Sequence, residues 1–165
     1  MRLSDAMSAD RIILDLQATN KDEAISELID LAAVSGGVEE TPEQLLKLVL
    51  EREALTSTAV DRGVAIPHTR SNRIEGVVVS LGIHRDGLDF GSLGIHRDGL
   101  DFGSLGGDLV HLVFLVLSAD SSTPAYLSVL GRTARIFRRP QMLQSVLEAE
   151  DANQILQYIS DHEPA

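Results

Sequence analysis

The chain has 165 residues, and this length accommodates one domain that buries roughly 70% of the surface exposed by its unfolded form. It has no cysteine, which excludes disulfides and thiolate metal sites, and no apolar run approaches the roughly 18 residues of a membrane-spanning helix. The net charge of -11 argues against nucleic acid as a partner, because a phosphate backbone would be repelled. Without a secretion signal or direct membrane insertion, a cytoplasmic protein is expected.

The first third of the chain predicts an extended segment followed by two helices. Residues 10–16 are typical of a short strand or an extended lead-in. Asn20 is a helix N-cap with Glu23 as its capping-box partner, and the apolar stripe that follows ends at residues 36–37. A second helix, with proline at its first position, is expected over residues 42–53.

Three apolar runs predict strands. The first is brief and covers residues 63–66, and the second covers residues 77–83. The third, residues 109–117, is nearly continuous and is typical of a strand buried on both faces of a sheet. We expect all three to belong to one sheet.

Three helices are expected after the last strand. The first opens at residues 122–124, and its predicted apolar stripe consists of Leu127, Leu130, Ala134 and Phe137. A short helix follows over residues 140–149, and Asp151 with Gln154 caps the last one. Helices before, between and after strands predict a single α/β domain, residues 1–165, with a central mixed β-sheet flanked by helices on both sides.

A tandem duplication interrupts this pattern, because residues 80–91 are repeated without a change as residues 92–103. Nothing else in the chain shares the period, so the repeat is a local duplication and not a solenoid. Its 12-residue length is even, so either copy preserves the in-out alternation of a strand. We expect residues 77–83 to keep the strand, residues 100–105 to keep the turn, and the material between to loop out or add a hairpin.

The duplicated segment also contains two misleading motifs. Residues 84–86 and 89–91 spell His-Arg-Asp and Asp-Phe-Gly, yet they are nearly adjacent and lack the Gly-rich loop and strand lysine of a protein kinase. His84 and His96 have no accompanying carboxylate-histidine cluster. We expect them to be exposed loop histidines, and we expect neither a metal site nor a cofactor.

A histidine follows the first apolar run, in the segment Gly63-Val64-Ala65-Ile66-Pro67-His68-Thr69-Arg70. Pro67 fixes its own φ and biases Ile66 towards extended geometry, so the chain is expected to deliver His68 into a polar loop. Imidazole is the side chain whose ordinary pKa lies closest to neutral pH, and it serves as a nucleophile, a base or a ligand. A Pro-His pair alone is weak evidence, and a loop histidine without a role is the alternative.

With its upstream context, Glu51-Arg52-Glu53-Ala54-Leu55-Thr56-Ser57-Thr58-Ala59-Val60, this segment resembles the enzyme IIA domain of the bacterial phosphotransferase system. The class is the mannitol/fructose one, which includes the nitrogen-regulatory enzyme IIA. The resemblance covers nearly the whole chain, and Arg52 stands sixteen residues before His68. It implies a histidine that accepts a phosphoryl group from the histidine phosphocarrier protein and passes it to a IIB domain.

The resemblance assigns roles to particular residues. His68 is the phosphoryl acceptor, and Arg52 stabilises the phosphoryl oxygens with its planar, permanently charged guanidinium. The hydroxyls of Ser57 and Thr58 are candidate phosphate contacts, although a loop filled with turn-forming residues explains them equally well.

Tyr126 is a departure from the family pattern. Members usually carry a second active-site histidine at the start of the helix after the apolar strand, and here Tyr126 occupies that position. A tyrosine donates a hydrogen bond to a phosphoryl oxygen but does not become cationic near neutral pH. His111 is expected to be a satisfied strand-end residue, and no role is expected for the flanking Arg62 and Arg70.

Two functions remain open from the sequence. The first is a phosphoryl carrier that passes phosphate from His68 to a IIB domain or uses it as a regulatory signal. The second is a regulatory, nitrogen-type binding module that senses phosphorylation state without productive transfer to sugar. The free-standing chain leans towards the nitrogen-regulatory branch, and Tyr126 slightly favours the second function. The duplication is expected to lie between two strands that flank the site.

Overall fold

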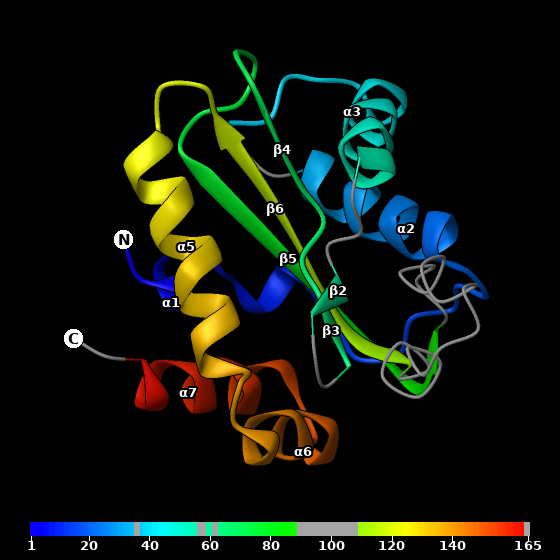
Figure 1. The fold of residues 1–165 in the computed structure, drawn as a ribbon, viewed down its shortest axis with the longest axis vertical. Coiled ribbons are helices and arrows are strands. Elements are labelled where there is room, and N and C mark those ends of the chain that lie inside the picture. Colours follow the sequence, from blue (N-terminus) through cyan, green and yellow to red (C-terminus); the bar gives the residue numbers. More distant parts are fainter. Residues whose placement is uncertain (35–36, 56–58, 61–62, 89–108, 164–165) are drawn as a thin grey trace.

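The structure of the protein is a computed structural model (Figure 1). It describes residues 1–34, 37–55, 59–60, 63–88 and 109–163. One mixed sheet of six strands has the order β1-β5-β6-β3-β2, and β4 pairs with β6 as well. The strands are β1 (Ile12–Ile13), β2 (Ala59–Val60), β3 (Val64–Ala65), β4 (His68–Ser71), β5 (Val77–Leu88) and β6 (Val110–Ala119). β5 and β6 are antiparallel, whereas β3 and β4 run parallel to β6.

Helices cover both faces of this sheet. They are α1 (Leu3–Ala6), α2 (Lys21–Ala33), α3 (Pro42–Leu55), α5 (Thr123–Ile136), α6 (Pro140–Glu148) and α7 (Ala152–His162), with a short 3-10 helix at Ala9–Arg11. Figure 1 shows α2 and α3 on one side of the sheet and α5 on the other. The predicted α/β fold is confirmed. Among the described residues, no helix is both long and apolar enough to span a bilayer.

Strand β6 separates two hydrophobic cores, one under each layer of helices. Its side chains alternate between the core shared with α1, α5, α6 and α7 and the core shared with α2 and α3. The first set is Leu112, Phe114 and Val116, and the second is Val113, Leu115 and Leu117. Burying each such side chain stabilises the fold by about 1.5–3 kcal/mol, which explains why this strand reads as a continuous apolar run.

The helix caps largely follow the sequence prediction. Asn20 Oδ1 accepts a hydrogen bond from the backbone N–H of Glu23 at 2.9 Å. The Glu23 carboxylate, however, accepts from the Thr19 backbone at 2.8 Å, so it satisfies a donor one residue earlier than a capping box would. Asp151 Oδ1 likewise accepts from the Gln154 backbone at 2.9 Å. These bonds supply partners to amides that a helix start leaves unpaired.

The sequence predicted that His68 lies in a polar loop. In the structure it begins strand β4 instead. Strands β3 and β4 pair with β6 at one unchanged offset, from Val64 opposite Leu112 to Ser71 opposite Ala119. They therefore form one extended segment, which is interrupted at Pro67 because proline has no N–H to donate to the ladder. The Pro67 carbonyl still accepts from the Val116 N–H at 3.0 Å. The sheet thus fixes the backbone on both sides of the histidine.

Gly63 supports this arrangement at the start of β3. It adopts φ +81°, a conformation that side chains with a Cβ rarely tolerate. Its carbonyl accepts from the N–H groups of His111 and Leu112, at 2.7 and 3.1 Å. This turn sets the register between β3 and β6 that β4 then continues.

Within α5 the buried face differs from the predicted stripe by about one residue, whereas Phe137, which follows the helix, is buried as predicted. Its buried residues are Tyr126, Val129, Thr133 and Ile136. Leu127, which was predicted to be apolar core, is 59% exposed. Leu130 and Ala134 are only partly buried against the core. The rotation of α5 about its own axis places Tyr126 on the face that packs against the sheet.

The duplicated segment contributes to strand β5 through its first copy. β5 continues to Leu88, which faces Val110, with a register irregularity after Ile83. His84 is therefore a strand residue whose Nε2 donates to the Ala18 carbonyl at 3.1 Å, and not an exposed loop histidine. The looped-out alternative is therefore wrong for residues 84–88, whereas the alternative of an added hairpin stays a prediction. His96 and the rest of the repeat lie outside the described residues.

Candidate active site

A cavity of about 340 Å³ lies beside β4, at the end of β6 from which α5 departs. Six residues line it: Arg52, His68, Thr69, Arg70, Asp120 and Tyr126. They come from the last turns of α3, from β4, from the residue after β6, and from the first turn of α5. Three residues singled out in the sequence, Arg52, His68 and Tyr126, thus meet in one cavity. Ser57, Thr58 and Arg62 lie outside the described residues.

Strand geometry determines which side chains of β4 face α5. Successive side chains of a strand point to opposite faces, so His68 and Arg70 share one face. Ile66, two residues before His68, belongs to the same hydrophobic core as Tyr126 on α5. This parity brings the imidazole and a guanidinium to the same layer of the molecule.

The imidazole of His68 is held by a local hydrogen bond. Nδ1 lies 2.7 Å from the carbonyl oxygen of Ile66, two residues back across Pro67. A carbonyl only accepts, so Nδ1 carries the proton and donates it. The other nitrogen, Nε2, then keeps its lone pair. This tautomer is the one in which Nε2 acts as a nucleophile.

The surroundings keep this imidazole neutral. Burial lowers the pKa of His68 below its ordinary value of 6.5, and the Arg52 charge lowers it further. The hydrogen bond to Ile66 and the negative charge of Glu53 oppose this shift of the pKa. Glu53 is a buried carboxylate near the end of α3, and its Oε2 lies 3.9 Å from the Lys21 ammonium. A neutral, nucleophilic imidazole near neutral pH results.

Tyr126 packs between the histidine and a second arginine. Its ring centroid lies 5.8 Å from that of His68, and the Arg70 guanidinium lies 5.3 Å from the same tyrosine centroid. Burial raises the pKa of Tyr126 above its ordinary value of 10.0, although the charges of Arg70 and Arg52 oppose this. The phenol therefore keeps its proton near neutral pH and remains a hydrogen-bond donor.

Arg70 was expected to flank the site without a role, and Asp120 was not singled out from the sequence, but both line the cavity. One guanidinium nitrogen of Arg70 donates to the Thr123 hydroxyl at 2.7 Å, and this hydroxyl in turn donates to the Asp120 carbonyl at 3.3 Å. The sequence did contain a signal for Arg70, namely its two-residue spacing from His68. That signal has meaning only once residues 68–71 are known to be a strand.

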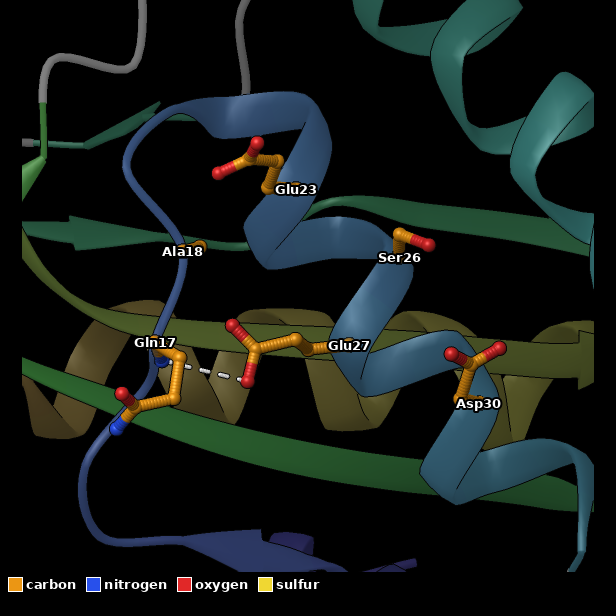
Figure 2. A pocket seen from close by; sticks show the side chains of 6 residues that line it. All are labelled: Gln17, Ala18, Glu23, Ser26, Glu27 and Asp30. Carbon is orange, nitrogen blue, oxygen red and sulfur yellow. Dashed lines mark hydrogen bonds between the residues drawn. The ribbon is translucent and has the colours of Figure 1, made fainter.

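A second cavity, of about 430 Å³, lies along α2 and is a poor site for the same chemistry (Figure 2). Its lining residues are Gln17, Ala18, Glu23, Ser26, Glu27 and Asp30. Three of these carry carboxylates, and none is basic or has an imidazole, so a phosphoryl group would be repelled there. In the part of the chain that the structure describes, no group of three His, Cys, Asp or Glu residues is arranged to hold a metal ion.

Comparison with known proteins identifies the class. Residues 5–162 match the family described as "Phosphoenolpyruvate-dependent sugar phosphotransferase system, EIIA 2". The chain belongs to this family, whose members are phosphoryl carriers in a phosphotransfer relay. The predicted resemblance is confirmed, and both sugar-specific and nitrogen-regulatory proteins are among the relatives.

Two curated relatives illustrate this range. The chain is 24% identical over 163 residues to the PTS system fructose-specific EIIABC component of Bacillus subtilis, a match that covers 99% of this chain but only 24% of that protein. It is 29% identical over 155 residues to a nitrogen regulatory protein of Bradyrhizobium diazoefficiens, which covers 94% of this chain and 92% of the relative. The chain thus spans about a quarter of the first relative and nearly all of the second.

Solved structures share the fold. The nitrogen regulatory protein IIA-Ntr from Neisseria meningitidis superposes with a TM-score of 0.80 at 22% identity, covering 95% of this chain and 98% of that one. Enzyme IIAMTL in its complex with phosphorylated enzyme IIBMTL from Escherichia coli gives a TM-score of 0.73 at 20% identity, covering 93% and 96%. The sheet and its helices are therefore common to both branches of the family.

Proposed function

We propose that this chain is a phosphoryl carrier in which Nε2 of His68 accepts a phosphoryl group from the phosphohistidine of the histidine phosphocarrier protein. The observation that carries the proposal is the hydrogen bond between Nδ1 and the Ile66 carbonyl, at 2.7 Å. It holds the proton on Nδ1 and leaves Nε2 unprotonated, in a cavity that Arg52 also lines. Residues 1–165 act as one domain in this role, in the cytoplasm.

The transfer exchanges one N–P bond for another. The lone pair of Nε2 forms the new bond to phosphorus, while the electron pair of the breaking bond stays on the donor imidazole. Nδ1 keeps its proton, so the phosphorylated ring of His68 carries a positive charge. The Ile66 carbonyl and the buried Glu53 carboxylate both favour a cationic ring, as their effects on the pKa of His68 indicate.

Arg52 and Tyr126 act on the phosphoryl group itself. The transition state spreads negative charge over the equatorial oxygens, and catalysis consists mostly of positioning and electrostatic stabilisation. Arg52 supplies a permanent positive charge from the end of α3, and Tyr126 supplies a phenol proton from α5. The hydroxyls of Ser57 and Thr58 are proposed as additional donors to the same oxygens.

Onward transfer to a IIB domain is the first of two outcomes for the phosphoryl group. A related IIA protein from Escherichia coli forms a complex with its phosphorylated IIB, and this supports a IIB partner here. The second outcome is a regulatory signal read by other proteins. The match over 92% of a nitrogen regulatory protein supports it, as does the phenol of Tyr126 where a second histidine usually stands.

The test is phosphorylation of the purified chain with phosphoenolpyruvate, enzyme I and the histidine phosphocarrier protein. We expect an acid-labile, alkali-stable phosphate that disappears in His68→Ala. His162→Ala is the matched control, because His162 is an exposed residue at the end of α7, and this variant should label like wild type. Unlabelled wild-type protein would contradict the proposal.

Adding candidate IIB domains to the labelled protein separates the two outcomes. A carrier loses its label to the IIB domain at a rate that depends on IIB concentration. A regulatory module keeps its label and binds a partner only in one phosphorylation state. Both results require His68 to be phosphorylated first.

A further inference from the structure

Arg70 is a cationic residue of the cavity lining that the proposed reaction does not yet use. It follows His68 by two residues on β4 and reaches α5, where it contacts the Thr123 hydroxyl at 2.7 Å and the Tyr126 ring at 5.3 Å from its centroid. Both contacts are to uncharged groups. The guanidinium is therefore held over the cavity without neutralisation of its charge by either contact.

Arg70 has no carboxylate partner among the described residues, although acidic side chains are plentiful in this chain. Acidic residues outnumber lysine and arginine by 25 to 14. Within the described residues, carboxylates form ion pairs with Arg2, Lys21, Arg85 and Arg132, among others, and none joins Arg70 to a carboxylate. Asp120 lines the same cavity but does not lie within ion-pair distance of Arg70. A cation kept in this way is ready to receive an anion.

We propose that Arg70 is a second phosphoryl-binding residue. When His68 is phosphorylated, the Arg70 guanidinium gives up its hydrogen bond to the Thr123 hydroxyl and binds the phosphoryl oxygens instead. The inference rests on the proposed function of His68. A guanidinium has five N–H donors, and Arg70 uses one of them on Thr123, so it can form a two-point contact with a phosphoryl group. The positive charges of Arg52 and Arg70 then match the two negative charges of a phosphoryl group on nitrogen.

The hydrogen bonds around Thr123 lower the free-energy cost of moving Arg70 from Thr123 to the phosphoryl oxygens. Its hydroxyl already donates to the Asp120 carbonyl at 3.3 Å and loses no donor bond when Arg70 departs. The Tyr126 ring supports the face of the guanidinium throughout, as a cation–π contact. The transfer step itself is unchanged, because Arg70 keeps all its protons and forms no covalent bond.

The two arginines differ in whether they act on the nucleophile. The Arg52 charge lowers the pKa of both His68 and Tyr126, whereas the Arg70 charge lowers the pKa of Tyr126. Arg52 thus acts on the nucleophile before transfer as well as on the phosphoryl oxygens. Arg70 contributes once the phosphoryl group has arrived between His68 and Tyr126.

Initial rates of phosphorylation by the phosphocarrier test this inference. We expect Arg70→Ala to lower kcat/KM about tenfold, through kcat, and Arg70→Lys to recover part of the loss. Arg73→Ala is the matched control, because Arg73 is exposed on the following turn, outside the cavity lining, and should behave like wild type. A rate for Arg70→Ala within twofold of wild type, or a loss confined to KM, would overturn the inference.

A spectroscopic measurement gives an independent answer. In the ¹⁵N NMR spectrum, the side-chain Nε–H of Arg70 should shift on phosphorylation of wild-type protein, while that of Arg73 should not. An unchanged Arg70 signal on fully phosphorylated protein would overturn the inference and leave the role of His68 intact. Wild-type protein that accepts no phosphate would instead overturn the proposed function, so the two failures are distinguishable.

Discussion

The two ends of the β5–β6 pair differ in what lies beside them: one end borders the cavity, and the other belongs to the duplicated segment. Where Val77 faces Ser118, β4 adds a third strand and α5 begins soon afterwards, so the cavity residues converge there. Where Leu88 faces Val110, the described part of β5 ends within the first copy of the duplicated segment. From Val110 to Val116, the strand partner of His68, β6 covers about 20 Å at 3.3 Å per residue.

This separation refines the expectation that the duplication lies between two strands that flank the site. The repeat begins within β5 at Ser80, which faces Leu115, but its residues 84–88 extend β5 to the end of the pair remote from the strand partner of His68, Val116. The chemistry depends on register and side-chain parity at one end of the pair. A longer chain at the other end changes neither the register nor the side-chain parity beside the cavity. The predictions below test this contrast, from the largest expected effect to the smallest.

The largest effect of the four is expected for Arg52→Ala at the cavity end. Loss of the guanidinium removes charge stabilisation from the phosphoryl oxygens, and phosphorylation by the phosphocarrier should slow about 100-fold with the fold retained. Lys47→Ala, an exposed position on the same helix, should be unaffected. Equal rates for wild type and Arg52→Ala would remove Arg52 from the site.

Tyr126 should show a smaller, separable effect. Tyr126→Phe loses only the phenol donor, so we expect phosphorylation about fivefold slower, equivalent to one hydrogen bond of about 1 kcal/mol. Tyr126→Ala also empties a buried position and should lower the free energy of unfolding by about 3 kcal/mol, measured by urea denaturation. Tyr158→Phe on α7 is the control for both measurements. A Tyr126→Phe rate equal to that of wild type would leave the phenol without a role.

The pH dependence of His68 should reflect its lowered pKa. An NMR titration should give a midpoint below the ordinary 6.5, and Arg52→Ala should move that midpoint upwards because the Arg52 charge lowers it. The unfolded chain binds this proton near 6.5 whereas the folded chain does not. The contribution of His68 to the free energy of unfolding is therefore complete above pH 6.5 and is lost as pH falls towards the folded pKa. A midpoint at or above 6.5 would contradict the burial argument.

The smallest effect is expected for a change at the Leu88–Val110 end of the β5–β6 pair. Deleting residues 92–103 yields the same product as deleting residues 80–91, because the two copies are identical. Since the described strand residues nearest to the deletion, Leu88 and Val110, pair at the end of β5–β6 remote from Val116, phosphorylation should stay within about twofold of wild type. A folded deletion variant that no longer accepts phosphate would show that the two ends are coupled.

Much of the fold was predictable because its strongest signals are periodic. The helices α2 and α3 and the buried strand β6 combine clear apolar patterns with recognisable boundaries, and they lie within a few residues of the predicted positions. On α5 the pattern was real but ambiguous. Leu127 and Tyr126 are adjacent and both large, and only packing against the sheet decides which of them is buried.

Strand β4 was not predictable in the same way. His68, Thr69 and Arg70 are only half-buried or exposed, so no apolar alternation marks the strand. It exists because Gly63 and β3 set a register with β6 that the chain continues past Pro67. The sequence therefore indicated His68 and Arg52 but missed Arg70, whose position depends on that strand.

The nitrogen atom that receives phosphate tests the central claim most directly. Two-dimensional NMR of the phosphorylated protein, with ¹⁵N in the histidine rings, distinguishes phosphate on Nε2 from phosphate on Nδ1. The hydrogen bond from Nδ1 to the Ile66 carbonyl predicts phosphorylation of His68 at Nε2, with Nδ1 still protonated. Phosphate on Nδ1 of His68, or on any other histidine, would contradict the account.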